Sequence, residues 1–266
     1  MFRSFLTVNK FFLKVIKKIT YIFFPHIFWK NYSKSQNFDQ ESTYLGKLAN
    51  QINISNSFIE FGFGSFEFNS ISLAKLGYKG LLLDSGKLNC QLANKIFSKL
   101  SLDVSALKHW VSLNTLDPII SFVSNLDNQL GFLNIDIDGN DYWILKKLIS
   151  QFQPHVICVE YNSSFGLKSI STPYKDRFDR HLEHESGCYH GASITAFYNL
   201  LNPSYCLVKN IAGMNLVFVH KNKMNDNLKS FKPEECYEEG TLRNQWSGMN
   251  ANQQWQKIKH LNFTKV

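Results

Sequence analysis

Acidic side chains and glycines stand where short apolar runs of the sequence end. Glu60, Gly62 and Gly64 fall within or just after one such run, and Asp84 closes the next. Glycine has no Cβ, so the backbone can turn sharply and come close to a ligand at these two positions. Asp84 lies 20 positions after Gly64, a spacing that nucleotide-binding βαβ units use to reach a ribose hydroxyl. The pattern predicts a nucleoside-binding turn between two buried strands.

The turn lacks the third glycine of a dinucleotide-binding motif, and this narrows the type of nucleoside it could bind. A dinucleotide fingerprint has a third glycine three positions after the second, and this chain has Glu67 there. A Glu-x-Gly-x-Gly turn favours a cationic ligand such as S-adenosylmethionine (SAM), because Glu60 would attract its positive charges and repel a pyrophosphate. We expect Glu60, Gly62, Gly64 and Asp84 to contact SAM. The alternative is an ordinary glycine turn in an α/β protein.

Acidic and amide side chains also end two later apolar runs. Asp136 and Asp138 close the first of these runs, and Glu160 and Asn162 close the second. In a parallel sheet, ligands bind outside the carboxyl ends of the strands, near the point where strand order reverses. We therefore predict that Asp136 joins the cofactor site and that Asp138 and Glu160 take part in catalysis.

The segment from Asp136 to Gly139 has other interpretations. Asp138 and Gly139 could form a turn and cap the helix that follows. Asp136-Ile137-Asp138 also matches the Asp-x-Asp pair that holds a divalent metal and a nucleotide sugar in many glycosyltransferases, although that fold does not need the glycine turn. An EF-hand calcium loop is excluded, because no Glu stands at its twelfth position.

Alternating strand and helix patterns position these residues. Short apolar runs predict strands, and apolar residues that recur every three or four positions predict helices. The predicted strands are 58–61, 81–83, 102–107, 132–137, 156–162, 205–208 and 216–219, and the predicted helices are 43–54, 68–76, 87–100, 114–123, 142–152 and 191–201. Strands that alternate with helices give a parallel sheet with right-handed crossovers. We therefore expect an α/β fold with a Rossmann-like seven-stranded methyltransferase sheet, mostly parallel with a terminal antiparallel hairpin, and helices on both faces.

The segments that carry the acids resemble the FkbM-type SAM-dependent methyltransferase family. The resemblance lies in residues 59–64, 67–70, 83–84 and 135–141, with 159–162 similar to the Glu-containing fifth strand of that family, and it covers roughly residues 57–220. It implies SAM as the cofactor and O-methylation of a sugar or a similar hydroxyl. Phe66 departs from the pattern, because many methyltransferases place a third glycine of the loop there.

Methyl transfer to an alcohol oxygen also requires a group that removes the hydroxyl proton. His190, in a polar loop just before Gly191, is our first candidate for this base, and His181 and His184 are alternatives. The competing interpretation is a surface histidine with no catalytic role, which is the commoner fate of a lone histidine in a loop.

A divalent metal is a second way to activate the acceptor. Asp138, Glu160 and Asn162 lie at adjacent predicted strand ends and offer only oxygen ligands, which suits Mg²⁺ better than zinc. We favour SAM as the only cofactor and keep Mg²⁺ as the alternative.

The bulk properties describe one α/β domain with appendages. The chain has 266 residues, of which 44% are hydrophobic, and a formal net charge of +8. Seven basic residues and no acid lie in residues 1–34, so the rest of the chain is nearly neutral. Because the body shows no basic stripe, nucleic-acid binding is not expected. The five cysteines are scattered and never paired as Cys-x-x-Cys, which favours a reducing, cytoplasmic location.

We divide the chain into a basic N-terminal arm at 1–36, a SAM-binding domain at 37–222 and a C-terminal appendage at 223–266 that packs on the domain. The arm is predicted to be an amphipathic helix that ends near Pro25 and either binds an anionic membrane surface or packs on the domain. It has no apolar run long enough to cross a membrane and no secretory cleavage signal. The expected acceptor is a small molecule or a glycan. A non-catalytic binding module on the same fold is the remaining alternative.

Overall fold

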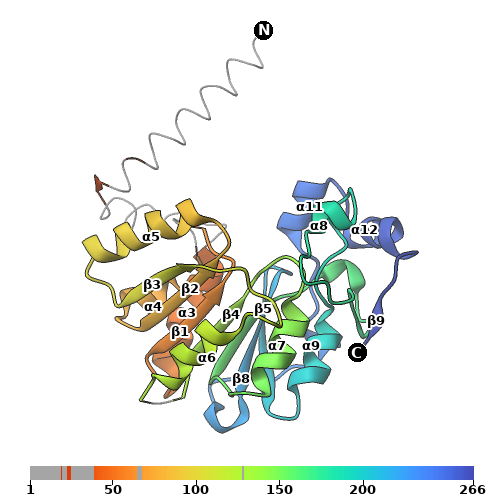
Figure 1. The fold of residues 1–266 in the computed structure, drawn as a ribbon. Helices are drawn as coiled ribbons and strands as arrows, with labels where there is room; N and C mark the ends of the chain where they lie inside the picture. The colour runs from red at the N-terminus through yellow and green to blue at the C-terminus, as the bar shows by residue number, and fades with distance from the viewer. Residues whose placement is uncertain (1–18, 20–22, 25–38, 65–67, 128) are drawn as a thin grey trace.

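The computed structural model describes residues 19, 23–24, 39–64, 68–127 and 129–266. Seven strands form one sheet in the order β3-β2-β1-β4-β5-β8-β7 (Figure 1). They are β1 (Ser57–Phe61), β2 (Lys79–Asp84), β3 (Val104–Lys108), β4 (Phe132–Ile135), β5 (Val156–Glu160), β7 (Tyr205–Ile211) and β8 (Asn215–His220). The strands β1 to β5 pair in parallel, and β8 is antiparallel to both β5 and β7. The predicted mostly parallel sheet with a terminal antiparallel hairpin is confirmed.

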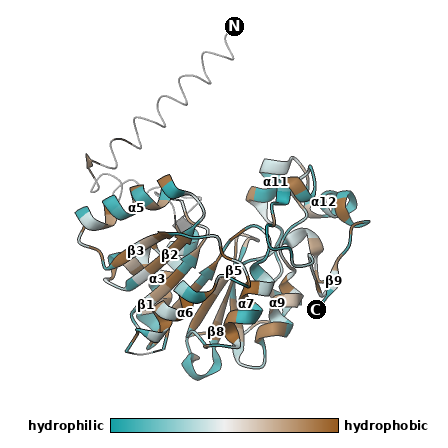
Figure 2. Cartoon of the chain, viewed as in Figure 1, coloured by the Kyte–Doolittle hydropathy of each residue, from teal (hydrophilic) through white to brown (hydrophobic). Residues whose placement is uncertain are grey.

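The central strands are buried on both faces, which explains their continuous apolar runs. Successive residues of β1 face opposite sides, so that Phe58 packs in one core cluster and Ile59 in the other. The first side is covered by α3 (Asp39–Gln51), α4 (Ile71–Lys75) and α5 (Lys87–Lys99), and the second by α6 (Asp117–Ser124), α7 (Asp141–Ile149) and α9 (Ile194–Leu201). Figure 2 shows brown, apolar strands enclosed by helices that carry teal, polar residues. Helices on both faces are therefore confirmed.

Two strands end earlier than their sequence patterns predict. The pattern 132–137 predicts a longer strand, but β4 ends at Ile135 and the backbone turns at Asp138, whose φ is 56°. The strand β5 likewise ends at Glu160, and the Asn162 N–H donates to the carbonyl oxygen of Ala192 at 2.8 Å, outside the seven-stranded sheet. Asp136, Asp138 and Asn162 therefore lie in loops just beyond the strands.

The polar loop predicted at 163–190 contains short elements that receive the C-terminal segment. These are η1 (Ser163–Phe165), β6 (Ile170–Ser171) and α8 (Arg180–Glu183). The C-terminal segment forms η2 (Lys221–Lys223), α10 (Pro233–Cys236), α11 (Thr241–Ser247), α12 (Ala251–Ile258) and β9 (Thr264–Lys265), and β9 pairs antiparallel with β6. Ile258 of α12 packs in a small apolar cluster with Phe165 and Tyr189. The chain end is thus attached to the loop that follows β5, while the domain boundary at residue 222 stays a prediction.

The predicted helix of the N-terminal arm lies outside the described residues, apart from Ile19, Phe23 and Phe24. Across the part of the chain that the structure describes, no helix combines the length and the apolar character needed to cross a membrane.

Candidate active site

A pocket opens at the carboxyl ends of β1, β2 and β4, close to the point where the strand order reverses. It contains about 710 Å³ of space not filled by atoms, with the open solvent at its mouth included. Four of the predicted site residues line it, namely Gly62, Asp84, Asp136 and Asp138. Among the described lining residues, three are aspartates and none is a lysine or an arginine.

Gly62 is required by the backbone at the floor of this pocket. Its φ of +72° is a conformation that residues with a Cβ rarely adopt. A Cβ at this position would lie 1.6 Å from the carbonyl oxygen of Asp136, so the two backbone segments can meet only if residue 62 is glycine. The Gly62 N–H donates to the carbonyl oxygen of Leu83 at 3.0 Å, which ties the turn to the end of β2.

Asp84 ends β2, and its two carboxylate oxygens have different surroundings: one accepts a backbone hydrogen bond and the other has no partner among the described residues. Its Oδ1 accepts the N–H of Gly86 at 2.7 Å and thereby fixes the turn into α5. No hydrogen bond to its Oδ2 is found among the described residues, and the residue lines the pocket. Asp84 can therefore hold the turn and still accept a hydrogen bond from a ligand hydroxyl.

Glu60 does not lie where we expected it, because it faces a helix and not the pocket. Its side chain is 1% exposed, and its two carboxylate oxygens accept the N–H groups of Asn69 at 2.7 Å and Ser70 at 2.8 Å. Burial raises the pKa of Glu60 to about 7, although these hydrogen bonds favour the charged form. The position between Ile59 and Phe61 could have shown this, since alternate strand residues face opposite sides. Glu60 supports the start of α4, and its expected contact with the cofactor is corrected.

Gly64 is also absent from the pocket lining. It is exposed. Residues 65–67 follow it and lie outside the described residues, so Phe66 and Glu67, which depart from the two sequence patterns, are not described. Of the two glycines in the predicted turn, Gly62 is the one that the described geometry places at the pocket.

The loop between β4 and α7 is shaped by Asp141. Its carboxylate accepts the N–H of Ile137 at 2.9 Å and the N–H of Gly139 at 2.8 Å. Burial is the main reason why the pKa of Asp141 is raised to about 6. The turn expected at Asp138 and Gly139 is present, since Asp138 has a φ of 56°, but the side chain that orders this backbone is that of Asp141.

Asp136 is half-buried in the pocket wall, and among the described residues no group donates a hydrogen bond to its carboxylate. Withdrawal from water raises its pKa well above the usual range, and the nearby charges of Glu160 and Asp138 raise it further. The Asp136 carboxyl therefore binds a proton more readily than a free aspartate does, and a cation that enters the pocket would favour its charged form.

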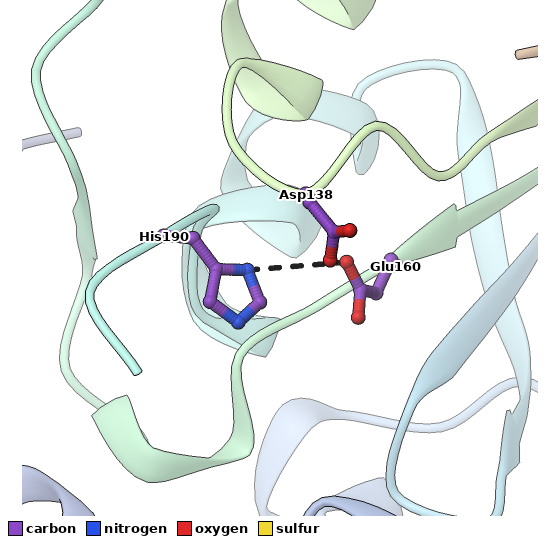
Figure 3. A group of neighbouring side chains, drawn as sticks. All are labelled: Asp138, Glu160 and His190. Atoms are coloured by element: carbon purple, nitrogen blue, oxygen red, sulfur yellow. Dashed lines mark ion pairs between the residues drawn. The ribbon is translucent and has the colours of Figure 1, made fainter. Parts of the chain in front are cut away.

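Asp138 and two side chains from distant parts of the chain, Glu160 and His190, point toward one another (Figure 3). One ligand atom each from Asp138, Glu160 and His190 lies within 4.8 Å of the others. Glu160 and His190 are 5% and 1% exposed, and His190 Nδ1 is 3.9 Å from Glu160 Oε2. The structure thus brings together the three residues predicted for catalysis.

Arginines hold the two acids of this cluster from outside. Arg243 of α11 donates from Nη2 to Glu160 Oε1 at 2.7 Å, and Arg180 of α8 donates from Nη1 to Asp138 Oδ1 at 2.5 Å. Burial raises the pKa of Glu160 to about 7, which shows that the Arg243 charge offsets only part of the desolvation.

The His190 ring makes no hydrogen bond within the described part of the chain, through either nitrogen. Its pKa is lowered well below the usual value, mainly by burial and then by the charges of Arg243 and Arg180. The imidazole is therefore neutral near pH 7. The interpretation of His190 as a surface residue is wrong.

The other candidates of the loop are excluded from this cluster by their contacts. Asn162 donates to the carbonyl oxygens of Cys188 and His190 and accepts from Ser164, so its predicted part in a metal site is corrected. His184 pairs with the Ser186 hydroxyl through Nδ1 at 2.8 Å, and His181 is an exposed residue of α8.

Several residues of the site were not predicted. Trp110 and Phe178 line the pocket, and Arg180 and Arg243 pair with its acids. Trp110 is 45% exposed, and its indole N–H donates to the carbonyl oxygen of Asp176 at 3.0 Å, which fixes the ring at the pocket mouth. None of these residues ends a strand, so the sequence carries no local signal for them.

Comparisons with known proteins give only distant matches. No protein-family model matches the chain, and no curated protein matches it. Similar solved structures include a SAM-dependent methyltransferase from Clostridium acetobutylicum (11% identity, 75% of this chain and 98% of that chain, TM-score 0.45) and an O-methyltransferase from Bacillus cereus in complex with SAH (14%, 70% and 81%, TM-score 0.42). A ribosomal protein L11 methylase from Lactobacillus delbrueckii matches at 16% identity over 71% of this chain and 81% of that chain, with a TM-score of 0.40. A likeness of this strength assigns neither a cofactor nor a substrate to this chain.

Proposed function

We propose that this protein is a SAM-dependent methyltransferase that transfers the methyl group to a hydroxyl oxygen. The observation that carries the proposal is the acid-lined pocket at the strand-order reversal, with Gly62 at its floor. Asp138 is paired with Arg180, but Asp84 and Asp136 form no ion pair among the described residues, which suits the sulfonium and ammonium charges of SAM and opposes a pyrophosphate. Asp84 would accept a hydrogen bond from a ribose hydroxyl, and Trp110 offers a flat apolar face for the adenine.

The hydroxyl acceptor would lie between this pocket and the cluster of Asp138, Glu160 and His190. Asp138 belongs to both, so a group bound at the cluster would face the methyl donor. The chain would align the two reactants and exclude water. The acceptor oxygen would bond to the methyl carbon as the methyl–sulfur bond breaks, which releases SAM as the neutral thioether, and the hydroxyl proton would pass to a basic group of the cluster. The resemblance to FkbM-type enzymes supports a sugar or a glycan- or lipid-linked hydroxyl as the acceptor.

The test of the cofactor is calorimetric titration of the purified chain with SAM and with its demethylated product, in EDTA. Wild type should bind with a micromolar Kd, and Asp84→Asn should weaken binding by about tenfold or more, because a charge-assisted hydrogen bond contributes about 1.5–3 kcal/mol. Asn keeps the Oδ1 acceptor for Gly86, so the turn into α5 should survive. Asp226→Asn, an exposed site outside the pocket lining, is the matched control.

Other outcomes would support the rival functions. Binding of a nucleotide sugar with Mn²⁺, and none of SAM, would favour a glycosyltransferase that uses Asp136 and Asp138. SAM binding that never leads to methyl transfer onto any hydroxyl acceptor, in a screen of sugars and lipid-linked sugars, would favour a non-catalytic binding module.

We also propose that the basic arm attaches the enzyme to an anionic membrane surface. Residues 1–34 combine seven basic side chains with many apolar ones and no acid. Deletion of these residues should abolish cosedimentation with vesicles rich in phosphatidylserine and leave SAM affinity unchanged. Undiminished sedimentation of the shortened chain would contradict this role.

A further inference from the structure

His190 is a buried polar side chain without a partner. It is 1% exposed, and neither ring nitrogen forms a hydrogen bond within the described part of the chain. A buried polar group that lacks a partner is rare and costly, and its usual explanation is a bound water, an ion or a functional role. The ring faces the carboxylates of Asp138 and Glu160 (Figure 3), and no described group forms a hydrogen bond with either ring nitrogen.

The carboxylates opposite His190 each keep one oxygen free. Glu160 Oε1 accepts a hydrogen bond from Arg243, and Asp138 Oδ1 accepts one from Arg180. For the second oxygen of each acid, no hydrogen bond is found among the described residues, and Glu160 Oε2 lies toward His190 Nδ1 at 3.9 Å. The arginines therefore fix the two acids from one side and leave an oxygen of each available on the other.

The spacing of the three side chains fits a single small cation. An ion about 2.1 Å from each ligand separates two ligand atoms at right angles by about 3 Å. The three atoms here lie within 4.8 Å of one another, so a movement of each ligand atom by about 1 Å would complete the coordination. Asp138 has 54% of its side chain exposed, which gives it the freedom for this adjustment.

The formal charges around the cluster also leave room for a divalent cation. Arg180 and Arg243 balance Asp138 and Glu160, and two further carboxylates, Asp136 and Asp141, lie close enough for their charges to act on the same group. Glu60 also acts on Asp136, so the carboxylates around the cluster outnumber its two arginines, and a bound cation would stabilise their charged forms.

We propose that Asp138, Glu160 and His190 bind one divalent metal ion of the Mn²⁺ or Zn²⁺ type. One imidazole and two carboxylates suit these ions better than Mg²⁺, which prefers oxygen ligands alone. The proposal gives His190 the role of a ligand and replaces Asn162 in the set expected from sequence. If the proposed methyl transfer is also correct, the ion would lie where the acceptor hydroxyl binds and would lower the pKa of that hydroxyl.

The experiment is a titration of the EDTA-stripped, dialysed full-length chain with Mn²⁺ alone, followed by electron paramagnetic resonance of the free ion and by calorimetry. Wild type should bind one Mn²⁺ per chain, and Zn²⁺ should compete for the same site. Asp138→Asn should weaken this binding by about tenfold or more, since it removes a charged ligand. Asn tolerates the left-handed φ of 56° at this exposed position, so the variant should fold.

Two further variants separate a built site from general attraction to acids. Asp176→Asn changes an exposed acid of the neighbouring loop and should leave Mn²⁺ affinity unchanged. His190→Phe, which keeps a planar ring in the buried position, should lose the site while circular dichroism shows a native fold. Cu²⁺ bound to wild type should show nitrogen hyperfine splitting that His190→Phe lacks.

Failure of this proposal is distinct from failure of the proposed methyl transfer. The metal site is overturned if wild type binds no Mn²⁺ or Zn²⁺ at millimolar concentration, or if Asp138→Asn and Asp176→Asn bind equally. Mn²⁺ binding without SAM binding would leave the metal site standing and remove the methyltransferase. SAM binding in EDTA without any metal binding would do the reverse.

Discussion

Two features of the backbone require glycine at position 62. The backbone needs a positive φ, and the Asp136 carbonyl occupies the space of a Cβ. Gly62→Ala should therefore destabilise the protein by more than the cost of about 1–2 kcal/mol that the left-handed conformation imposes on a non-glycine residue. Urea unfolding followed by circular dichroism measures the difference.

Gly77→Ala is the matched control for this substitution. Gly77 has a similar φ of +81°, but apart from its chain neighbours no described residue has an atom within 4 Å of the position of its missing Cβ. It should lose only the conformational part of the free energy of unfolding. Equal losses in the two variants would show that β1 and the β4 loop do not need their close contact.

How far the site could be predicted depends on whether a residue ends a strand. Asp84 and Asp136 were placed correctly because apolar runs mark strand ends, and strand ends share one edge of a parallel sheet. Glu60 lies inside its strand, where side-chain alternation and not proximity to the glycine turn decides its direction. Arg243 is 83 positions from Glu160, so no local pattern could have joined them.

Among the elements, α4 is a five-residue helix whose start depends on a buried carboxylate. The N–H groups of Asn69 and Ser70, which precede its first turn, are both accepted by Glu60. A helix this short has little stability of its own, so its position comes from this contact and from the apolar packing of Ile71 and Leu73.

The stability of this arrangement should fall as the pH rises. Burial raises the pKa of Glu60 from 4.5 to about 7 in the folded state, so the folded protein holds a proton that the unfolded chain releases. The contribution is fully present below pH 4.5, declines as the pH rises toward 7 and is lost above it. A shift of this size corresponds to about 3 kcal/mol. Urea unfolding at pH 5, 6, 7 and 8 in EDTA would follow the decline.

Glu60→Gln isolates this contribution from those of other buried acids. The variant cannot titrate at position 60, so its free energy of unfolding should decline less between pH 5 and 8 than that of wild type. Glu185→Gln, at an exposed position, should keep the wild-type slope. If Glu60→Gln also keeps that slope, Glu60 is ionised at pH 5 in the folded state.

The order of the elements was predictable, and their ends were less so. Strands buried on both faces give continuous apolar runs, which is why the central strands were found, whereas the edge strand β3 has only Ala106 buried and a weaker pattern. The helix predicted at 43–54 is α3 (Asp39–Gln51), because polar residues extend its start, and the strand predicted at 132–137 ends at Ile135, because Asp141 draws the backbone into a turn. Hydrogen bonds between loop backbone and side chains set these ends, and periodicity does not report them.

Across the whole molecule, the C-terminal segment reaches back to the centre of the sheet through one buried ion pair. Arg243 is 6% exposed and donates to the Glu160 carboxylate and to the carbonyl oxygen of Tyr161 at 3.1 Å. In the same region, the Tyr237 hydroxyl donates to the carbonyl oxygen of Ser163 at 2.9 Å. The segment that follows β8 therefore supports Glu160 of the candidate site through Arg243, although none of its described residues lines the pocket.

Removal of the Arg243 charge should be costly because its partner stays buried. Arg243→Met is expected to lower the free energy of unfolding by about 3–5 kcal/mol at pH 8, as Glu160 is left without a counterion. The loss should be smaller at pH 5, where a lone buried carboxyl is protonated. The double variant Arg243→Met/Glu160→Gln should recover most of it. Urea unfolding of metal-free protein at both pH values provides the measurement.

Lys175→Met supplies the comparison, because it breaks an ion pair with Glu183 at the surface. Lys175 is 59% exposed, and pairs of this kind contribute at most about 1 kcal/mol. If Arg243→Met costs no more than Lys175→Met, then packing alone attaches the C-terminal segment and the Glu160 carboxylate is not held by Arg243. A large loss of stability in Arg243→Met that the double variant reverses would instead show that Arg243 and Glu160, 83 positions apart, stabilise each other through their charges.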